Sequence, residues 1–120
     1  MAQRVYQIAF NITGAQAADH VFTWKVPFAC QIIHVSMSNS TANAGTLDLG
    51  PAADADGYLN GATFGVSAAC TEIAAFADFD GAVSNGQFPK VADGTVLHVT
   101  IIDHASNMAD SCVVITFTEG

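Results

Sequence analysis

The fold is decided by the stretch DGTVLHVTIIDHASNMADSCVVITFT, residues 93–118. In each half of this stretch, apolar and polar side chains alternate, and the apolar positions are Leu97, Val99, Ile101, Val113, Ile115 and Phe117. A period of two places each apolar trio on one face of a strand, where it can pack against a second layer. The small polar residues 104–110 indicate a surface loop, and Asp93-Gly94 indicates a turn. The stretch therefore predicts a closing β-hairpin.

The rest of the chain repeats this pattern of short strands. Alternation predicts strands over residues 4–12, 20–26, 29–38 and 46–49. A further brief strand is expected at Phe64 and Val66, whereas residues 67–79, which are rich in alanine, are expected to form one or two helical turns. Seven or eight short strands with turn residues between them predict a single all-β domain over residues 1–120, an antiparallel sandwich or barrel.

The expected core is made of the inward-facing side chains of these strands. It consists of Phe22, Trp24, Ile33, Val35, Leu97, Val99, Ile101, Val113, Ile115 and Phe117. If the strand over residues 20–26 is oriented in this way, Trp24→Ala should destabilise the protein by roughly 3–5 kcal/mol.

Charge and composition exclude two classes of partner. The net charge is −8, and the only lysines and arginines are Arg4, Lys25 and Lys90. Nucleic acids and anionic membranes are bound by clusters of such residues, so neither is expected as a partner. The sequence has no run of 18 apolar residues, and its first residues lack the apolar segment of a signal peptide. We therefore expect a protein that is made in the cytoplasm of its host and is soluble.

Cysteine and histidine usage suggests no metal site. The three cysteines, Cys30, Cys70 and Cys112, form no CxxC pair, and each is expected to be a buried thiol. Four histidines could supply ligands, namely His20, His34, His98 and His104. Strand parity suggests that His34 and His98 share one surface of the sheet, but the sequence has no His-x-His or His-x-Asp pair, so surface or interface histidines are the better interpretation.

One acidic segment resembles the start of a calcium-binding loop. Asp54-Ala55-Asp56-Gly57 has alternate carboxylates followed by glycine. The glutamate that an EF-hand requires is missing, because residues 64–66 are Phe, Gly and Val. We expect a solvated turn here, and no metal or other cofactor in the protein.

No arrangement of residues predicts catalysis. GxSxG is absent, pairing any cysteine with a histidine would be arbitrary, and Glu72 is the only glutamate in the interior of the sequence. No glycine-rich phosphate loop precedes a helix. We therefore expect no catalytic residues and no enzymatic activity.

Five segments carry a resemblance to a known group of proteins. They are residues 22–28 (FTWKVPF), 32–36 (IIHVS), 45–50 (GTLDLG), 91–95 (VADGT) and 113–117 (VVITF). Their order resembles the small jelly-roll capsid decoration, or cement, proteins of tailed bacteriophages. The resemblance implies a jelly roll of about eight strands that binds the major capsid protein on the outside of the virion as a homo-oligomer. Head-fibre and tail-associated β-domains of phages share such patterns.

Two further expectations accompany this resemblance. The apolar composition and the short strands favour self-association, and a trimer is preferred over a dimer because it would match local three-fold positions of an icosahedral shell. The alternative function is a carbohydrate-binding β-sandwich, in which Trp24, Tyr6 and Tyr58 would stack on sugars. Exposed aromatic side chains along one groove would favour that alternative, whereas a flat apolar face would favour assembly.

Overall fold

The computed structural model describes residues 4–16, 18–80, 87–103 and 108–119. Within these ranges the chain forms nine strands and a short 3₁₀ helix. They are β1 (Val5–Ala15), β2 (His20–Lys25), β3 (Cys30–Ser38), β4 (Thr46–Pro51), β5 (Leu59–Thr63), β6 (Thr71–Ile73), η1 (Phe76–Asp78), β7 (Lys90–Val91), β8 (Val96–Ile102) and β9 (Ala109–Glu119).

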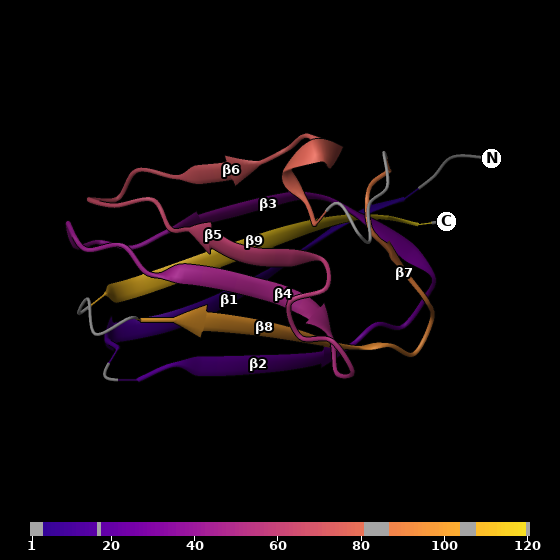
Figure 1. Cartoon of the computed structure of the whole chain (residues 1–120), viewed down its shortest axis with the longest axis horizontal. Coiled ribbons are helices and arrows are strands. Elements are labelled where there is room, and N and C mark those ends of the chain that lie inside the picture. Colours follow the sequence, from indigo (N-terminus) through magenta and orange to yellow (C-terminus); the bar gives the residue numbers. More distant parts are fainter. Residues whose placement is uncertain (1–3, 17, 81–86, 104–107, 120) are drawn as a thin grey trace.

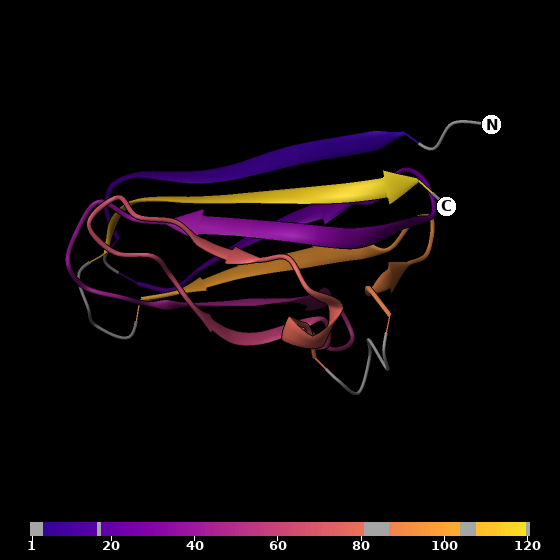
Figure 2. The ribbon, with the colours of Figure 1, turned by 90° about the horizontal axis from the view of Figure 1, so that it is seen from above.

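The strands form two sheets that pack face to face. Sheet A has the order β1-β9-β3-β6, with β7 also paired to β3, and sheet B has the order β2-β8-β4-β5. Every pair of neighbouring strands is antiparallel. The strands run along the long axis of a body of 43 × 25 × 24 Å (Figure 1), and Figure 2 separates the two layers. The expected all-β antiparallel sandwich is confirmed, and its strand arrangement is compatible with a jelly roll.

The expected closing hairpin is wrong, although both of its strands exist. β8 lies between β2 and β4 in sheet B, whereas β9 lies between β1 and β3 in sheet A. The two apolar trios therefore face each other across the core instead of lying side by side, and all six side chains are buried. Alternation of apolar and polar residues specifies which face of a strand is buried, but it does not specify which other strand lies beside that strand in the sheet.

The register of β3 differs from the expectation at one residue. Ile32 lies opposite Phe117 and His34 lies opposite Thr116, so the extra residue Ile33 forms a β-bulge. The bulge shifts the alternation by one position, so Ile32 is buried in the core and Ile33 is only half-buried. The assignment of Ile33 to the core was therefore wrong, while that of Val35 was correct.

The middle of the chain also departs from the expected elements. The strand expected at Phe64 and Val66 lies earlier, as β5, and Phe64 follows it as a buried residue. Residues 67–79 contain the short strand β6 as well as the single 3₁₀ turn η1. Ser67 and Ala68 have positive φ values of 54° and 65°, so the chain turns before β6 instead of continuing as a helix.

Aromatic side chains close the core between the two sheets. Phe117 of sheet A is fully buried, and its ring centroid lies 5.3 Å from that of Trp24 in sheet B. Phe10 and Phe22 form a second contact of this kind, also at 5.3 Å. Trp24 and Phe22 pack against the core but are only half-buried, because β2 is an edge strand of sheet B.

Candidate interaction surfaces

The described residues contain neither a pocket nor a metal-binding cluster. No cavity opens among them, and no three histidine, cysteine, aspartate or glutamate side chains gather where they could hold an ion. Nor does any helix within the described ranges have the length and apolar character needed to cross a membrane. The candidate functional features of this part of the molecule are therefore its two outer faces and its sheet edges.

The histidines are distributed over the molecule. His34 lies on β3 in sheet A and His98 on β8 in sheet B, so the expectation that they share one surface is wrong. His34 Nε2 is 3.3 Å from a carboxylate oxygen of Glu72 on the neighbouring strand β6. His20 is exposed, with its ring 4.4 Å from that of Phe22, and His104 lies outside the described residues.

The acidic segment forms a tight turn between β4 and β5. Asp54 N–H donates to the carbonyl of Pro51 at 3.0 Å, and Gly57 N–H donates to the carbonyl of Asp54 at 2.9 Å. A hydrogen bond from the side chain of Asp56 raises the pKa of the exposed Asp54 carboxyl, and slight desolvation and the nearby carboxylates of Asp56 and Asp80 raise it further. The two carboxyl groups therefore contact each other within an exposed turn.

The cysteines differ in exposure. All three are free thiols; Cys30 is buried, Cys112 is half-buried and Cys70 is exposed. The expectation of three buried thiols is therefore wrong for Cys70, which follows the turn at residues 67–68 and immediately precedes β6. Burial raises the pKa of both the Cys30 and Cys112 thiols, and Cys70 adds to the effect on Cys112.

The aromatic residues proposed for sugar stacking do not line a groove. Tyr58 is buried, and burial raises the pKa of its hydroxyl. Trp24 packs against Phe117 inside the sandwich, and the ring of Tyr6 lies 4.5 Å from that of Phe28. The arrangement that would have favoured carbohydrate binding is therefore not present among these three residues.

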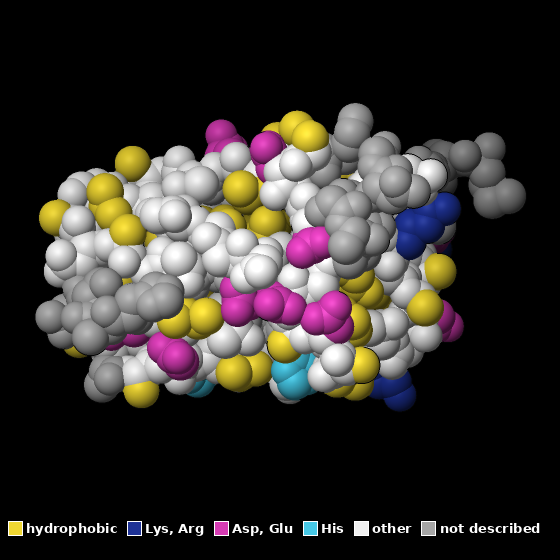
Figure 3. Space-filling model, in the orientation of Figure 1, with side chains coloured by type: hydrophobic (Ala, Val, Ile, Leu, Met, Phe, Trp, Pro, Cys, Tyr) yellow, Lys and Arg dark blue, Asp and Glu magenta, His cyan; other side chains and the backbone are white. Residues whose placement is uncertain are grey.

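Three acidic residues lie on the outer face of sheet B and in the turn beside it. Asp48 of β4 points outward and accepts a hydrogen bond from the N–H of Gly61 in β5 at 2.8 Å. Asp54 and Asp56 follow in the turn after this strand. Figure 3 shows acidic side chains in a row across the middle of the face that it displays and the few basic ones at its rim.

The outer face of sheet A is built mainly from small and neutral side chains. On its two longest strands, β1 and β9, the outward positions are Val5, Gln7, Ala9, Asn11, Thr13, Asp110, Cys112, Val114, Thr116 and Thr118. Gln7 donates a hydrogen bond from Nε2 to Thr116 Oγ1 at 3.2 Å, which ties β1 to β9 on this face. Among these ten side chains, only that of Asp110 is charged. The face is therefore suited to contact with another protein surface.

Strand β1 is the longest edge strand of the structure and carries no charged residue. Among the described residues it pairs only with β9, and its outward-facing side chains are exposed from Val5 to Ala15. Alternation in the sequence predicted this strand but not its position at an edge. The absence of charge and proline over residues 5–15 was the available signal, because natural edge strands are normally protected by such residues.

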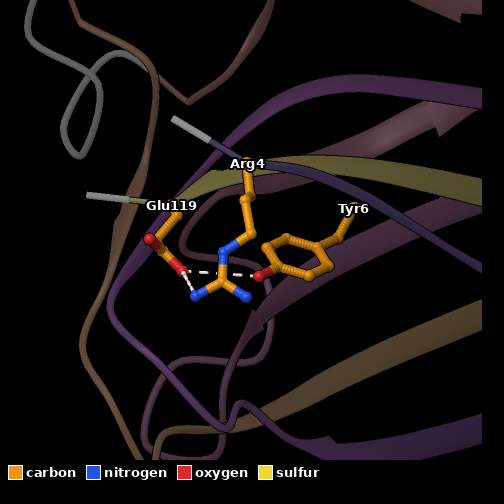
Figure 4. Close-up of polar contacts among 3 residues, drawn as sticks. All are labelled: Arg4, Tyr6 and Glu119. Carbon is orange, nitrogen blue, oxygen red and sulfur yellow. Dashed lines mark hydrogen bonds and ion pairs between the residues drawn. The ribbon is translucent and has the colours of Figure 1, made fainter. Parts of the chain in front are cut away.

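Three side chains anchor the start of β1 to the end of β9 (Figure 4). Arg4 forms an ion pair with Glu119 at 3.2 Å, and Tyr6 Oη donates to the same carboxylate oxygen at 3.4 Å. The Arg4 guanidinium also lies 5.9 Å from the centroid of the Tyr6 ring. The ion pair is largely exposed, so it should contribute only about 0.2–1 kcal/mol. Its main effect is to offset the two charges at this end of the edge.

Comparison with known proteins shows the fold and no family. No family model matches the sequence, and no curated protein matches it either. A solved structure described as "Cyanophage Pam1 capsid asymmetric unit" contains a chain similar to this one, with a TM-score of 0.57 and 17% sequence identity. The match covers 98% of this chain and 85% of that one. At this identity, the likeness establishes that the two chains share an overall fold.

Proposed function

We propose that this protein is a non-enzymatic structural component of a bacteriophage virion that binds the outside of the capsid and stabilises the shell. The observation that carries the proposal is the fold likeness to a chain of a cyanophage capsid, which extends over 98% of the present chain. The match also covers 85% of the other chain, so the two are similar in size as well as in fold.

Physical features of the surface support a capsid-binding role. The chain is acidic, with a net charge of −8, so packaged DNA would repel it and the exterior of a shell suits it. A protein that binds only the assembled lattice stabilises that lattice by its binding free energy alone. Such a role requires an extended contact surface, and the nearly uncharged outer side of β1 and β9 supplies a surface of this type.

The proposal includes the major capsid protein as partner and self-association of the chain. The sequence favoured a trimer for the oligomer. Assembly onto the particle would take place after synthesis in the bacterial host.

Deletion and add-back on phage particles test the proposal. Particles from a phage that encodes this chain should contain it in many copies by mass spectrometry, and electron microscopy should show outer density that is lost when the gene is deleted. Deleted particles should release DNA at a lower temperature, and the purified protein should restore the wild-type temperature. Particles that lack the protein, or density confined to the tail, would contradict the capsid role; in the tail case, the protein would be a tail component.

Two matched variants identify the face that binds the shell. Val114→Arg places a bulky charge on the outer face of sheet A, and Thr100→Arg does the same on sheet B. If the face of sheet A docks, only Val114→Arg should fail to co-sediment with capsids. A glycan array serves as the control for the carbohydrate alternative, and specific binding of the purified protein to a sugar would favour that function.

A further inference from the structure

The free edge of β1 presents a row of backbone groups whose direction follows from one hydrogen bond. Glu119 N–H donates to the carbonyl of Arg4 at 2.9 Å, one step beyond the first pair of the ladder, in which Val5 lies opposite Thr118. In an antiparallel pair, hydrogen-bonded and non-hydrogen-bonded positions alternate. Tyr6 and every second residue up to Ile12 therefore direct their backbone groups to β9. The residues between them direct N–H and C=O away from the sheet, and these are Val5, Gln7, Ala9 and Asn11.

The other sheet edges within the described residues are protected, and this one is not. β2 has six residues with the exposed Lys25 at its end and Pro27 just beyond. β5 has five residues and contains Gly61 at a φ of 70°, and β6 has three residues with the charged Glu72 at its centre. β1 has eleven residues and its register is regular as far as Ile12. A long, regular and uncharged edge is a template for pairing with another strand.

We propose that the free edge of β1 pairs antiparallel with β1 of a second copy of this chain, around a two-fold axis at Ile8. This axis places Val5 opposite Asn11 of the second copy and Gln7 opposite Ala9. All four residues with outward-directed backbone groups then find partners. On the inner side, Ile8 meets Ile8 of the second copy and Tyr6 meets Phe10, which would cover the half-buried side chains of Tyr6 and Ile8.

Charge and symmetry favour a second copy as the occupant. Two chains of net charge −8 repel each other unless they meet at a surface without charge, and residues 5–15 carry none. Of the charges next to this strand, Arg4 and Glu119 are paired with each other, and Asp110 accepts a hydrogen bond from Gly14 N–H at 2.8 Å, beyond the segment 5–11 that would pair. A ring of three copies would require two different open edges on each chain, whereas a two-fold contact uses one edge twice. The described part of the chain offers one long open edge, so the pair is a dimer in place of the trimer that the sequence favoured.

Edge-specific proline variants test this pairing. Ala9→Pro removes an N–H that points to the second copy, and proline is tolerated where an edge N–H faces solvent. Thr23→Pro is the matched control on the edge strand β2. Val26 N–H donates to Thr95 O at 2.8 Å, so Val26 and every second residue before it direct their backbone groups to β8. Thr23 lies three residues before Val26, so its N–H points away from β8. In sedimentation velocity, wild type and Thr23→Pro should be dimers. Ala9→Pro should have a dimer dissociation constant at least about tenfold higher.

A second pair of variants keeps the test valid if proline impairs folding. Ala9→Glu adds a carboxylate on each side of the two-fold axis and should also weaken the dimer at least about tenfold, whereas Thr23→Glu should not. Circular dichroism establishes that each variant is folded. A wild-type protein that is monomeric up to its solubility limit, or a trimer, would overturn the proposal. So would a dimer that Ala9→Glu leaves unchanged.

Cross-linking tests the register. In a Cys70→Ser background, Gln7→Cys mixed with Ala9→Cys should form a disulfide-linked dimer on oxidation, because hydrogen-bonded pairs have Cα atoms about 5.5 Å apart. Ala9→Cys alone should not, since the two copies of residue 9 would be offset along the strands. Efficient linkage in Ala9→Cys alone would refute an axis at Ile8. These measurements use the isolated protein, so their outcome is independent of whether the chain binds capsids.

Discussion

The contact between Phe117 and Trp24 provides a quantitative test of how the two sheets are held together. Phe117 is fully buried on the central strand β9, so Phe117→Ala should lower the free energy of unfolding by roughly 3–5 kcal/mol. The total stability of a domain is on the order of 5–15 kcal/mol, so this single truncation should remove a large part of it. Trp24→Ala should cost less than Phe117→Ala, because the indole is only half-buried on an edge strand.

The double variant measures the contact itself. Aromatic rings at a centroid distance of 5.3 Å and an angle of 47° should be coupled by about 0.5–1.5 kcal/mol beyond their separate burial. Urea unfolding of wild type, the two single variants and the double variant should be followed by circular dichroism, because Trp24 is the only tryptophan and its replacement removes the fluorescence signal. All four should be measured at the same protein concentration, because self-association would shift the midpoint. Strict additivity of the two single effects, or a cost of Phe117→Ala below about 1 kcal/mol, would refute this packing.

Four further predictions concern single features of the molecule. The buried Ser111 hydroxyl has no hydrogen-bond partner, so Ser111→Ala should leave the free energy of unfolding unchanged or raise it; a loss above about 1 kcal/mol would contradict this. Cys70 should react with iodoacetamide much faster than Cys30 in a mass-spectrometric time course, and equal rates would disprove the burial difference. Because burial raises the pKa of Cys30 above its unfolded value, its contribution to stability is present below about pH 8.5 and should decline as the pH rises further. Chelation should leave the urea midpoint unchanged, and a stoichiometric metal lost on His34→Ala or His98→Ala would overturn that expectation.

Local alternation predicted the strands well because each strand buries one face. The trios Leu97, Val99, Ile101 and Val113, Ile115, Phe117 are all in the core, as the sequence indicated. Pairing was not predictable in the same way, since a strand buried on one face has the same pattern whether the following strand lies beside it or across the core. The bulge at Ile33 was also hidden, because a single extra residue looks like an irregularity in the alternation.

The interaction surface could not be identified from residue types alone. A sheet edge becomes a candidate site only when its neighbours are known, and β1 is an edge because β9, more than ninety residues later, occupies its other side. The same limit applied to His34 and His98, whose shared parity suggested a common surface that the division into two sheets rules out.

The pairing of β1 with β9 has a consequence for synthesis on the ribosome. β1 is made about a hundred residues before its partner β9, an interval of roughly 5–20 s at an elongation rate of about 5–20 residues per second. Throughout that interval neither side of β1 has a partner strand, and neighbouring nascent chains on one polysome carry the same uncharged segment. Sheet A therefore cannot close until β9 has been synthesised, and β1 stays open to pairing with other chains until then. A message truncated before residue 109 would leave a product that cannot close sheet A and is prone to aggregate.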